Sequence, residues 1–271
     1  MRNRLIQLLS DNRRPFVPMA QRVHAAVDGE EATIYLYDPI VGDRATAEWW
    51  GGVCPQDFVP ALHSLKAKKI HLRVNSPGGD VFGAEAMCQA LREHDAHIVA
   101  HIEGLAASAA TSITCACDEV RMTPASKFMV HETWTLTMGN KRDHAATMDL
   151  LSKCDESMYA EYAARTGQSL EQLRAWCEAE TWFTAQQAID AGFVDALAET
   201  AASRGTESKA AANARWRLSA YLHAPAQGEP ADADNPLPAV PAPVQTSEQP
   251  NTGHRQRQQQ RLRLLQAIQI E

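Results

Sequence analysis

The sequence predicts an α/β domain with a largely parallel sheet flanked by helices. Between about residues 32 and 198, segments rich in β-branched and aromatic residues alternate with segments of helical pattern. Such alternation is typical of units in which a crossover helix joins two parallel strands. The 271-residue chain is 45% hydrophobic and 22% charged, which is enough apolar surface for one large core.

Five segments have the pattern of strands and six have the pattern of helices. The predicted strands cover residues 32–38, 69–75, 97–103, 119–122 and 127–131. The predicted helices cover residues 55–68, 80–94, 105–117, 141–166, 169–178 and 184–191. Asp80 can cap the second of these helices, and Gly167 and Gly192 stand where glycine commonly follows a helix end.

Charge and cysteine content restrict the class of protein. The net charge is −7, whereas proteins whose main partner is nucleic acid are basic. Six cysteines are scattered through the chain, and the pair Cys115 and Cys117 has no second pair at a zinc-binding spacing. No apolar run approaches the roughly 18 residues of a membrane-spanning helix. The apolar stretch 5–9 is too short for a signal-peptide core, so we expect a cytoplasmic protein with reduced thiols and no membrane partner.

The two ends of the chain differ from its middle. Residues 1–31 are predicted to be a loose N-terminal arm, followed by a folded domain over residues 32–200. Residues 201–254 are rich in proline and alanine and are predicted to be a disordered linker. Residues 255–271 regain leucine and isoleucine, which predicts a short amphipathic helix that docks on a partner.

A turn with the sequence VNSPGGD follows the predicted strand 69–75 and precedes a helix. Pro77 fixes one backbone dihedral, and Gly78 and Gly79 permit conformations and close approaches that a β-carbon would prevent. A turn of this kind can present backbone N–H groups to an anion or to a peptide carbonyl. Taken alone, it is also an ordinary connection between a strand and a helix.

The stretch EGLAASAAT, residues 103–111, carries one conspicuous hydroxyl, that of Ser108. It follows the predicted strand 97–103 and begins a helix, so the amide of Ala109 is one of the unpaired donors of a first helical turn. This is the physical arrangement of a nucleophile elbow, although G-x-S-x-G is not present. Taken alone, the small side chains are equally explained by close helix packing.

His131 stands at the carboxyl end of the predicted strand 127–131. In open α/β sheets, ligands and catalytic groups gather at the carboxyl ends of the strands. The glycine turn, Ser108 and His131 are therefore predicted to lie at one edge of the sheet. The nine other histidines compete as candidates: His24, His63, His71, His94, His97, His101, His144, His223 and His254.

Four motifs in one order, over residues 32–198, resemble those of the Clp-type serine peptidases. They are NSPGGDVFGAEAM, GLAASAAT, KFMVHETWT and ETWFTAQQAIDAGFVD. More narrowly, they resemble the head maturation (prohead) proteases of phages and prophages. The resemblance implies a Clp protease/crotonase-like fold with a handle-like helix at 141–166, followed here by a disordered C-terminal tail.

The resemblance also implies the site. Ser108 is expected to be the nucleophile, His131 its general base and Glu180 the third member of the triad. Gly79 and Ala109 are expected to supply the N–H groups of the oxyanion hole. The remaining candidates are Gly78, Gly104 and Ala107 for substrate binding, and Glu178, Asp190 and Asp195 as substitutes for the acid. The chemistry requires neither a metal nor an organic cofactor.

The phage resemblance implies a role and partners. The expected substrates are capsid and scaffold proteins, cleaved inside an assembling procapsid in the cytoplasm of a bacterial host. A ring-forming homo-oligomer is implied through the handle-like helix. Residues 1–21 do not match the segment that docks an ATP-driven unfoldase, so that partner is in doubt. The tail is expected to be a scaffold-like tether or a segment removed by self-cleavage.

Other readings stay open at this stage. A general Clp-type peptidase working with an unfoldase would carry the same motifs. A crotonase would share the oxyanion hole without needing a Ser–His pair, and a Ser–Lys peptidase would use Lys127, Lys141 or Lys153. A scaffold-like capsid assembly protein with a decayed peptidase domain is the non-enzymatic alternative. Fluorophosphonate labelling that depends on both Ser108 and His131 separates an active protease from the crotonase and the scaffold.

Overall fold

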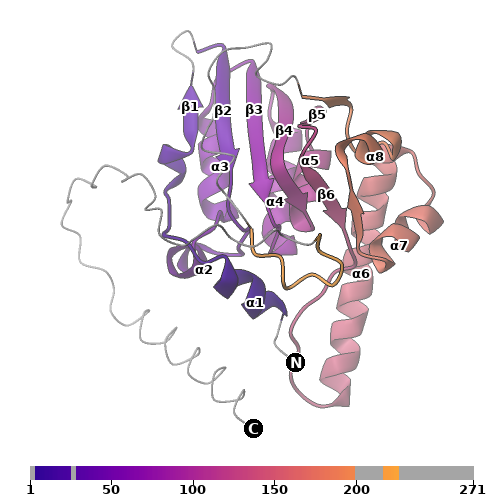
Figure 1. Ribbon diagram of the computed structural model, residues 1–271. Helices are drawn as coiled ribbons and strands as arrows, with labels where there is room; N and C mark the ends of the chain where they lie inside the picture. Colours follow the sequence, from indigo (N-terminus) through magenta and orange to yellow (C-terminus); the bar gives the residue numbers. More distant parts are fainter. Residues whose placement is uncertain (1–3, 26–28, 199–215, 226–271) are drawn as a thin grey trace, which may run out of the picture. The chain divides into compact units, whose positions relative to one another are not determined.

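An eight-stranded sheet organises the part of the chain that the computed structural model describes, namely residues 4–25, 29–198 and 216–225 (Figure 1). The strands are β1 Val23–Ala25, β2 Glu31–Leu36, β3 Lys69–Ser76, β4 His97–Ala107, β5 Glu119–Met122, β6 Lys127–Val130, β7 Thr181–Phe183 and β8 Ala196–Leu197. The helices are α1 Arg4–Asp11, α2 Arg44–Trp50, α3 Pro55–Ser64, α4 Val81–Glu93, α5 Ala109–Cys115, α6 Lys141–Thr166, α7 Leu170–Glu178 and α8 Ala185–Asp190, with a 3-10 turn at Met19–Gln21. All described residues belong to one unit, Met1–Ala226.

The sheet is largely parallel. Its main path runs in the order β1-β2-β3-β4-β5-β8, and only β1 and β7 pair antiparallel to a neighbour. The long strand β4 changes partner along its length. Val99–Ile102 pair with β5, whereas Leu105–Ala107 pair with β6, which in turn pairs with β7. The second half of β4 therefore starts a branch of the sheet.

Helices cover one face of the sheet, on which the apolar side chains of alternate strand residues are buried. In β3 these are Ile70, Leu72 and Val74, all fully buried, while His71 and Arg73 on the opposite face are half-buried. Figure 1 shows α3, α4 and α5 behind the strands. This confirms the predicted α/β class with a mostly parallel sheet.

The long helix α6 begins and ends as the sequence predicts. Asn140 forms a capping box with Asp143 at its start, and Gly167 follows its end with a left-handed φ of 70°. Residues of its first half are largely exposed, and that half extends away from the sheet (Figure 1). It is the handle-like helix of the prediction.

Residues 105–107 were expected to begin a helix, and this expectation is wrong. They continue β4 and pair with Lys127, Phe128 and Met129 of β6. Leucine and alanine favour a helix locally, but the pairing with β6 overrides that preference and decides their conformation. The helix α5 consequently starts at Ala109, directly after Ser108.

Both ends contain ordered elements where the sequence indicated none. Within the predicted arm, α1 packs through Leu8, which is 1% exposed, and β1 joins the sheet. Within the predicted linker, residues 216–225 pack against the domain, and Trp216 and Tyr221 are buried. The rest of the tail, including the helix predicted over 255–271, lies outside the described residues.

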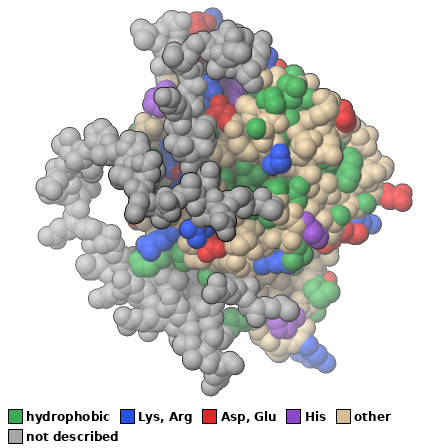
Figure 2. All heavy atoms as spheres, in the orientation of Figure 1, with side chains coloured by type: hydrophobic (Ala, Val, Ile, Leu, Met, Phe, Trp, Pro, Cys, Tyr) green, Lys and Arg blue, Asp and Glu red, His purple; other side chains and the backbone are tan. Residues whose placement is uncertain are grey.

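The surface charges, the hydropathy of the helices and the arrangement of possible metal ligands complete the description. In Figure 2, acidic and basic side chains of the described residues are interspersed on the visible face. Among the described residues, no helix is long and apolar enough to cross a membrane. No group of three or more histidine, cysteine or acidic residues there is placed to hold a metal ion.

Phe193→Ala should strongly destabilise the domain. Phe193 is fully buried, and its ring lies 4.8 Å from that of Phe128 and 5.3 Å from that of Tyr162. Removing it leaves a cavity, so urea denaturation should show a loss of about 3–5 kcal/mol in the free energy of unfolding. Leu170→Ala, at a side chain 55% exposed, is the control and should change it by less than about 0.5 kcal/mol. Equal losses in the two variants would contradict this assignment of the core.

Candidate active site

The register of two parallel strands places Ser108 beside His131. Ala107 at the end of β4 pairs with Met129 of β6, and the Ser108 amide donates to the Met129 carbonyl at 2.9 Å. His131 is the residue directly after the end of β6. Because both strands run the same way, the residues that follow them lie at the same edge of the sheet.

Ser108 adopts a backbone conformation that is rare for a residue with a side chain. Its φ is 54° and its ψ is −131°, at the sharp turn from β4 into α5. The turn is held by Thr111, whose amide and hydroxyl both donate to the Ser108 carbonyl, at 2.8 and 2.6 Å. The Thr111 hydroxyl in turn meets the hydroxyl of the buried Tyr162 on α6. A strained turn kept by such supports is typical of a nucleophile elbow.

The imidazole of His131 is oriented to accept a proton from Ser108. Its Nε2 lies 2.8 Å from the Ser108 Oγ. The indole N–H of Trp134 also points to this Nε2, at 3.2 Å. An indole nitrogen can only donate, so Nε2 is the acceptor and the ring proton of the neutral imidazole lies on Nδ1.

Burial keeps His131 neutral. The side chain is 7% exposed, and burial lowers the pKa of its imidazole from 6.5 to about 4. The negative charge of Glu180 and a hydrogen bond to the backbone of Glu132 raise the pKa and offset part of this effect. At neutral pH the ring is therefore a free base, as a general base must be.

Glu180 lies opposite His131 but is bound elsewhere. Val130 pairs with Thr181 in the antiparallel pair of β6 and β7, which brings the preceding Glu180 next to His131. Its carboxylate accepts hydrogen bonds from the amides of Leu222 at 2.9 Å and His223 at 2.6 Å. Within the described part of the chain, no hydrogen bond joins Glu180 to His131. The acid is therefore adjacent to the pair without orienting it in this conformation.

The glycine turn forms the wall facing Ser108. A β-carbon on Gly78 would lie 2.8 Å from the Ser108 Cβ, and one on Gly79 would lie 2.0 Å from the Ile40 carbonyl oxygen. The Ile40 amide binds the Gly78 carbonyl, and the Asp80 amide binds the Ile40 carbonyl. These bonds fix the peptides on both sides of Gly79, and only glycine fits there.

Ser108, Gly79 and Ala109 line one small cavity, together with His131, Trp134 and Tyr221. Its volume is about 40 Å³, room for only one or two water molecules. The three predicted substrate-binding residues do not line it. Gly78 backs Ser108, Ala107 is buried in the core, and Gly104 packs against the Asn75 side chain rather than along the cavity.

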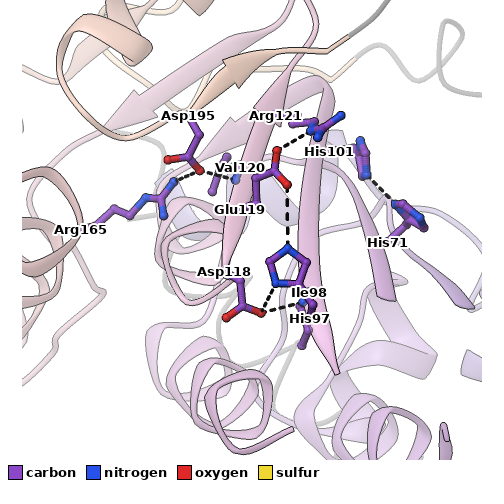
Figure 3. A network of polar contacts seen from close by, with 10 residues as sticks. All are labelled: His71, His97, Ile98, His101, Asp118, Glu119, Val120, Arg121, Arg165 and Asp195. Carbon is purple, nitrogen blue, oxygen red and sulfur yellow. Dashed lines mark hydrogen bonds and ion pairs between the residues drawn. The ribbon is translucent and has the colours of Figure 1, made fainter. Parts of the chain in front are cut away.

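The substitute acids lie in other surroundings. Asp195 binds the guanidinium of Arg165 and the amide of Val120 at 2.7 Å (Figure 3). Asp190 accepts from Gln186 at the end of α8. Glu178 is exposed at the end of α7. Asp195 thus joins β5 to α6, which is a structural role.

The three candidate lysines and two of the candidate histidines also lie in other surroundings. Lys127 binds the Ala125 carbonyl, and Lys141 and Lys153 are exposed on α6. His71 and His101 lie on the half-buried face of the sheet and meet each other at 2.8 Å (Figure 3), and neither lines the Ser108 cavity. No lysine among the described residues lines the Ser108 cavity.

Sequence reasoning missed three contributors to this site. Trp134 donates to the base, Tyr221 closes the cavity, and Asp155 on α6 holds the loop after His131 by accepting from the Thr133 amide and hydroxyl, at 2.7 and 2.8 Å. Trp134 stands within the KFMVHETWT motif, so its closeness to His131 in the sequence could have indicated its role. Tyr221 lies beyond an alanine-rich stretch and had none.

The buried imidazole gives a prediction about pH. His131 should titrate near pH 4 in ¹⁵N NMR spectra, with the proton of the neutral ring on Nδ1. Because the folded pKa is below the unfolded value, its contribution to stability is complete above pH 6.5 and is lost as the pH falls through about 4. His131→Gln assigns the resonance. Titration near pH 6.5 in the wild-type protein would contradict the burial of the ring.

Comparisons with known proteins agree on one family. Residues 31–201 match the family described as Clp protease. The ATP-dependent Clp protease proteolytic subunit 2 of Rhodococcus jostii (strain RHA1) is 30% identical over 141 residues, covering 51% of this chain and 72% of that protein. The ATP-dependent Clp protease proteolytic subunit of Streptococcus pneumoniae (strain Hungary19A-6) is 30% identical over 144 residues, covering 52% and 72%.

The fold comparison points the same way. A ClpP1 mutant from Listeria monocytogenes superposes with a TM-score of 0.54 at 20% identity, covering 64% of this chain and 93% of that one. At this identity the likeness concerns the fold. Together with the family match and the 30% identical relatives, it shows that this chain belongs to the Clp protease family of serine peptidases.

Proposed function

We propose that Ser108 and His131 are the nucleophile and general base with which this Clp-type serine endopeptidase cleaves peptide bonds. The observation that carries the proposal is the 2.8 Å contact between Ser108 Oγ and His131 Nε2, made at a strained turn at the edge of the sheet. Ser108 and His131 are 23 positions apart, and the pairing of β4 with β6 brings them together. A crotonase would not need this pair.

The reaction follows from the geometry. Ser108 Oγ attacks the carbonyl carbon of the substrate while its proton passes to His131 Nε2. The Gly79 and Ala109 amides, beside Ser108 in the same cavity, would donate hydrogen bonds to the resulting oxyanion. The imidazolium then returns the proton to the leaving amine, which leaves an acyl-serine. Water, deprotonated by the same imidazole, releases the acid and restores the serine hydroxyl.

Glu180 is proposed as the acid that stabilises the imidazolium formed during this reaction. Its charge already acts on His131, because it raises the pKa of the imidazole against the effect of burial. Each of its two carboxylate oxygens also accepts a hydrogen bond from one backbone amide, that of Leu222 or His223. Its φ of 48° marks a constrained position directly before β7.

The relatives favour a general Clp-type peptidase over the prohead branch. Both curated relatives named above are ATP-dependent Clp proteolytic subunits of bacteria. We therefore propose that this chain degrades proteins delivered by an ATP-driven partner, although residues 1–21 lack the usual docking pattern. Capsid and scaffold proteins as substrates, and a place in a procapsid, stay predictions that cleavage of a neighbouring capsid protein would test.

A homo-oligomeric ring is part of the proposal. Large apolar side chains are exposed on the loop before α6 and on its first half: Leu136, Met138, Met148 and Leu150. Met148 is 68% exposed. Apolar groups gathered on a projecting helix are typical of a surface that another subunit covers.

Ser108→Ala should abolish labelling by a fluorophosphonate and hydrolysis of peptides, because it removes the attacking oxygen. Ser157→Ala is the control, since that exposed hydroxyl on α6 bonds only to the Lys153 carbonyl. Gel fluorescence after labelling, with intact mass to count adducts, measures both. Labelling that persists in Ser108→Ala would overturn the assignment of the nucleophile.

Gly79→Ala tests whether the Gly79 amide stabilises the oxyanion. The added β-carbon would lie 2.0 Å from the Ile40 carbonyl oxygen, so the turn must move and displace its amide. The rate of acylation should fall on the order of 10²-fold, the effect of losing one oxyanion donor. Gly167→Ala is the matched control, because that glycine also has a positive φ, of 70°, but open space around it. Equal effects of both substitutions would show a general loss of stability.

A further inference from the structure

The cavity at Ser108 is closed by a segment that lies far away in the sequence. Residues 216–225, here called the strap, cross the carboxyl ends of the strands and are drawn in orange in Figure 1. The strap has no helix or strand of its own, yet Trp216, Ala220 and Tyr221 are each at most 5% exposed. An irregular segment that is this deeply buried is held by specific contacts.

One end of the strap is anchored by α1 and the residues that follow it. The Asn12 side chain binds both the amide and the carbonyl of Arg217, at 2.8 and 2.9 Å. The Trp216 indole donates to the Asn75 side chain at 2.7 Å, and the Arg14 guanidinium lies 4.1 Å above its ring. These are interactions with backbone and side-chain groups of the kind that fix a bound peptide.

The middle of the strap fills the site itself. The Tyr221 hydroxyl donates to the Pro77 carbonyl at 2.5 Å, and Tyr221 lines the same cavity as Ser108. Its ring packs edge-on against His131 at 5.5 Å, Trp182 at 5.9 Å and Trp134 at 6.3 Å. The tyrosine therefore occupies an aromatic pocket that includes the proposed general base.

The far end of the strap binds Glu180, the acid of the proposed triad. The Leu222 and His223 amides donate to the two carboxylate oxygens of Glu180. A charge-assisted pair of hydrogen bonds is among the stronger polar contacts. The strap thus leaves the Ser108–His131 contact intact, lines the cavity at Ser108 and binds both carboxylate oxygens of Glu180.

We propose that the strap is an internal peptide ligand of the active site, which inhibits the enzyme in cis until it leaves and which shows that the site takes an aromatic side chain beside Ser108. The inference rests on the proposed peptidase function. With the strap in place, Tyr221 lines the cavity at Ser108 and about 40 Å³ of that cavity remains. The strap lies outside residues 31–201, the range that matches the Clp protease family, so it is an addition to the family's peptidase domain.

The test uses the full chain on a Ser108→Ala background, so that binding is measured without cleavage. The probe is a fluorescein-labelled peptide with the sequence WRLSAYLHAP, that of residues 216–225. Fluorescence polarisation compares this parent with a variant that also carries Trp216→Ala and Tyr221→Ala. If the strap is closed most of the time, apparent affinity falls by the open fraction, so the variant should bind at least about tenfold more tightly.

Two controls make the result specific. Leu222→Pro removes the amide that binds Glu180, whereas Leu222→Ala keeps that amide and truncates a side chain that is 65% exposed. Only Leu222→Pro should increase peptide affinity, and this pair decides the outcome if the double variant does not fold. A probe with aspartate in place of its tyrosine should bind at least about tenfold more weakly, because the carboxylate would lose its hydration in an aromatic pocket.

The outcomes are distinct. Equal affinity of parent, double variant and Leu222→Pro, whether tight or undetectable, would overturn the strap as an occupant of the site. Equal affinity for the tyrosine and aspartate probes would overturn the aromatic preference. With Ser108 restored, fluorophosphonate labelling then tests the proposed function separately. A strap-released protein that binds the peptide but is not labelled would refute the peptidase and leave the strap confirmed.

Discussion

The partner change of β4 is the constraint on which the site depends. Its first half pairs with β5 and its second half with β6, while β3 remains its neighbour on the other side. This register fixes Ser108 next to His131, and the antiparallel addition of β7 brings Glu180 alongside. Three residues from distant parts of the sequence thus become neighbours through backbone hydrogen bonds alone. Side chains then only need to adopt the correct rotamers.

Burial determines the chemistry of these neighbours. A histidine at the exposed edge of a sheet would be half charged near its ordinary pKa of 6.5, whereas the enclosed His131 is neutral well below that value. Trp134 and Tyr221 contribute to the enclosure, with rings 5.9 and 5.5 Å from the imidazole. The state of the general base is therefore coupled to a segment outside the matched peptidase domain.

The sequence determines the site better than it determines the boundaries around it. Ser108, His131 and the glycine turn each follow a strand, so their placement at one edge could be predicted from local patterns. Residues 105–107 could not, because their strand conformation depends on pairing with β6. That α1 and residues 216–225 are ordered could not be predicted either. Each stabilises the other through contacts such as Asn12 with Arg217, which span about two hundred positions and leave no local signal.

Glu180 links the register of the strands to the binding of the strap. The same register that makes it a candidate triad member also places its carboxylate within reach of the strap. In the closed form the amides of Leu222 and His223 use that carboxylate. The same carboxylate raises the pKa of the His131 imidazole. A single carboxylate can therefore link occupancy of the peptide site to the readiness of the base, without any change in the contact between Ser108 and His131.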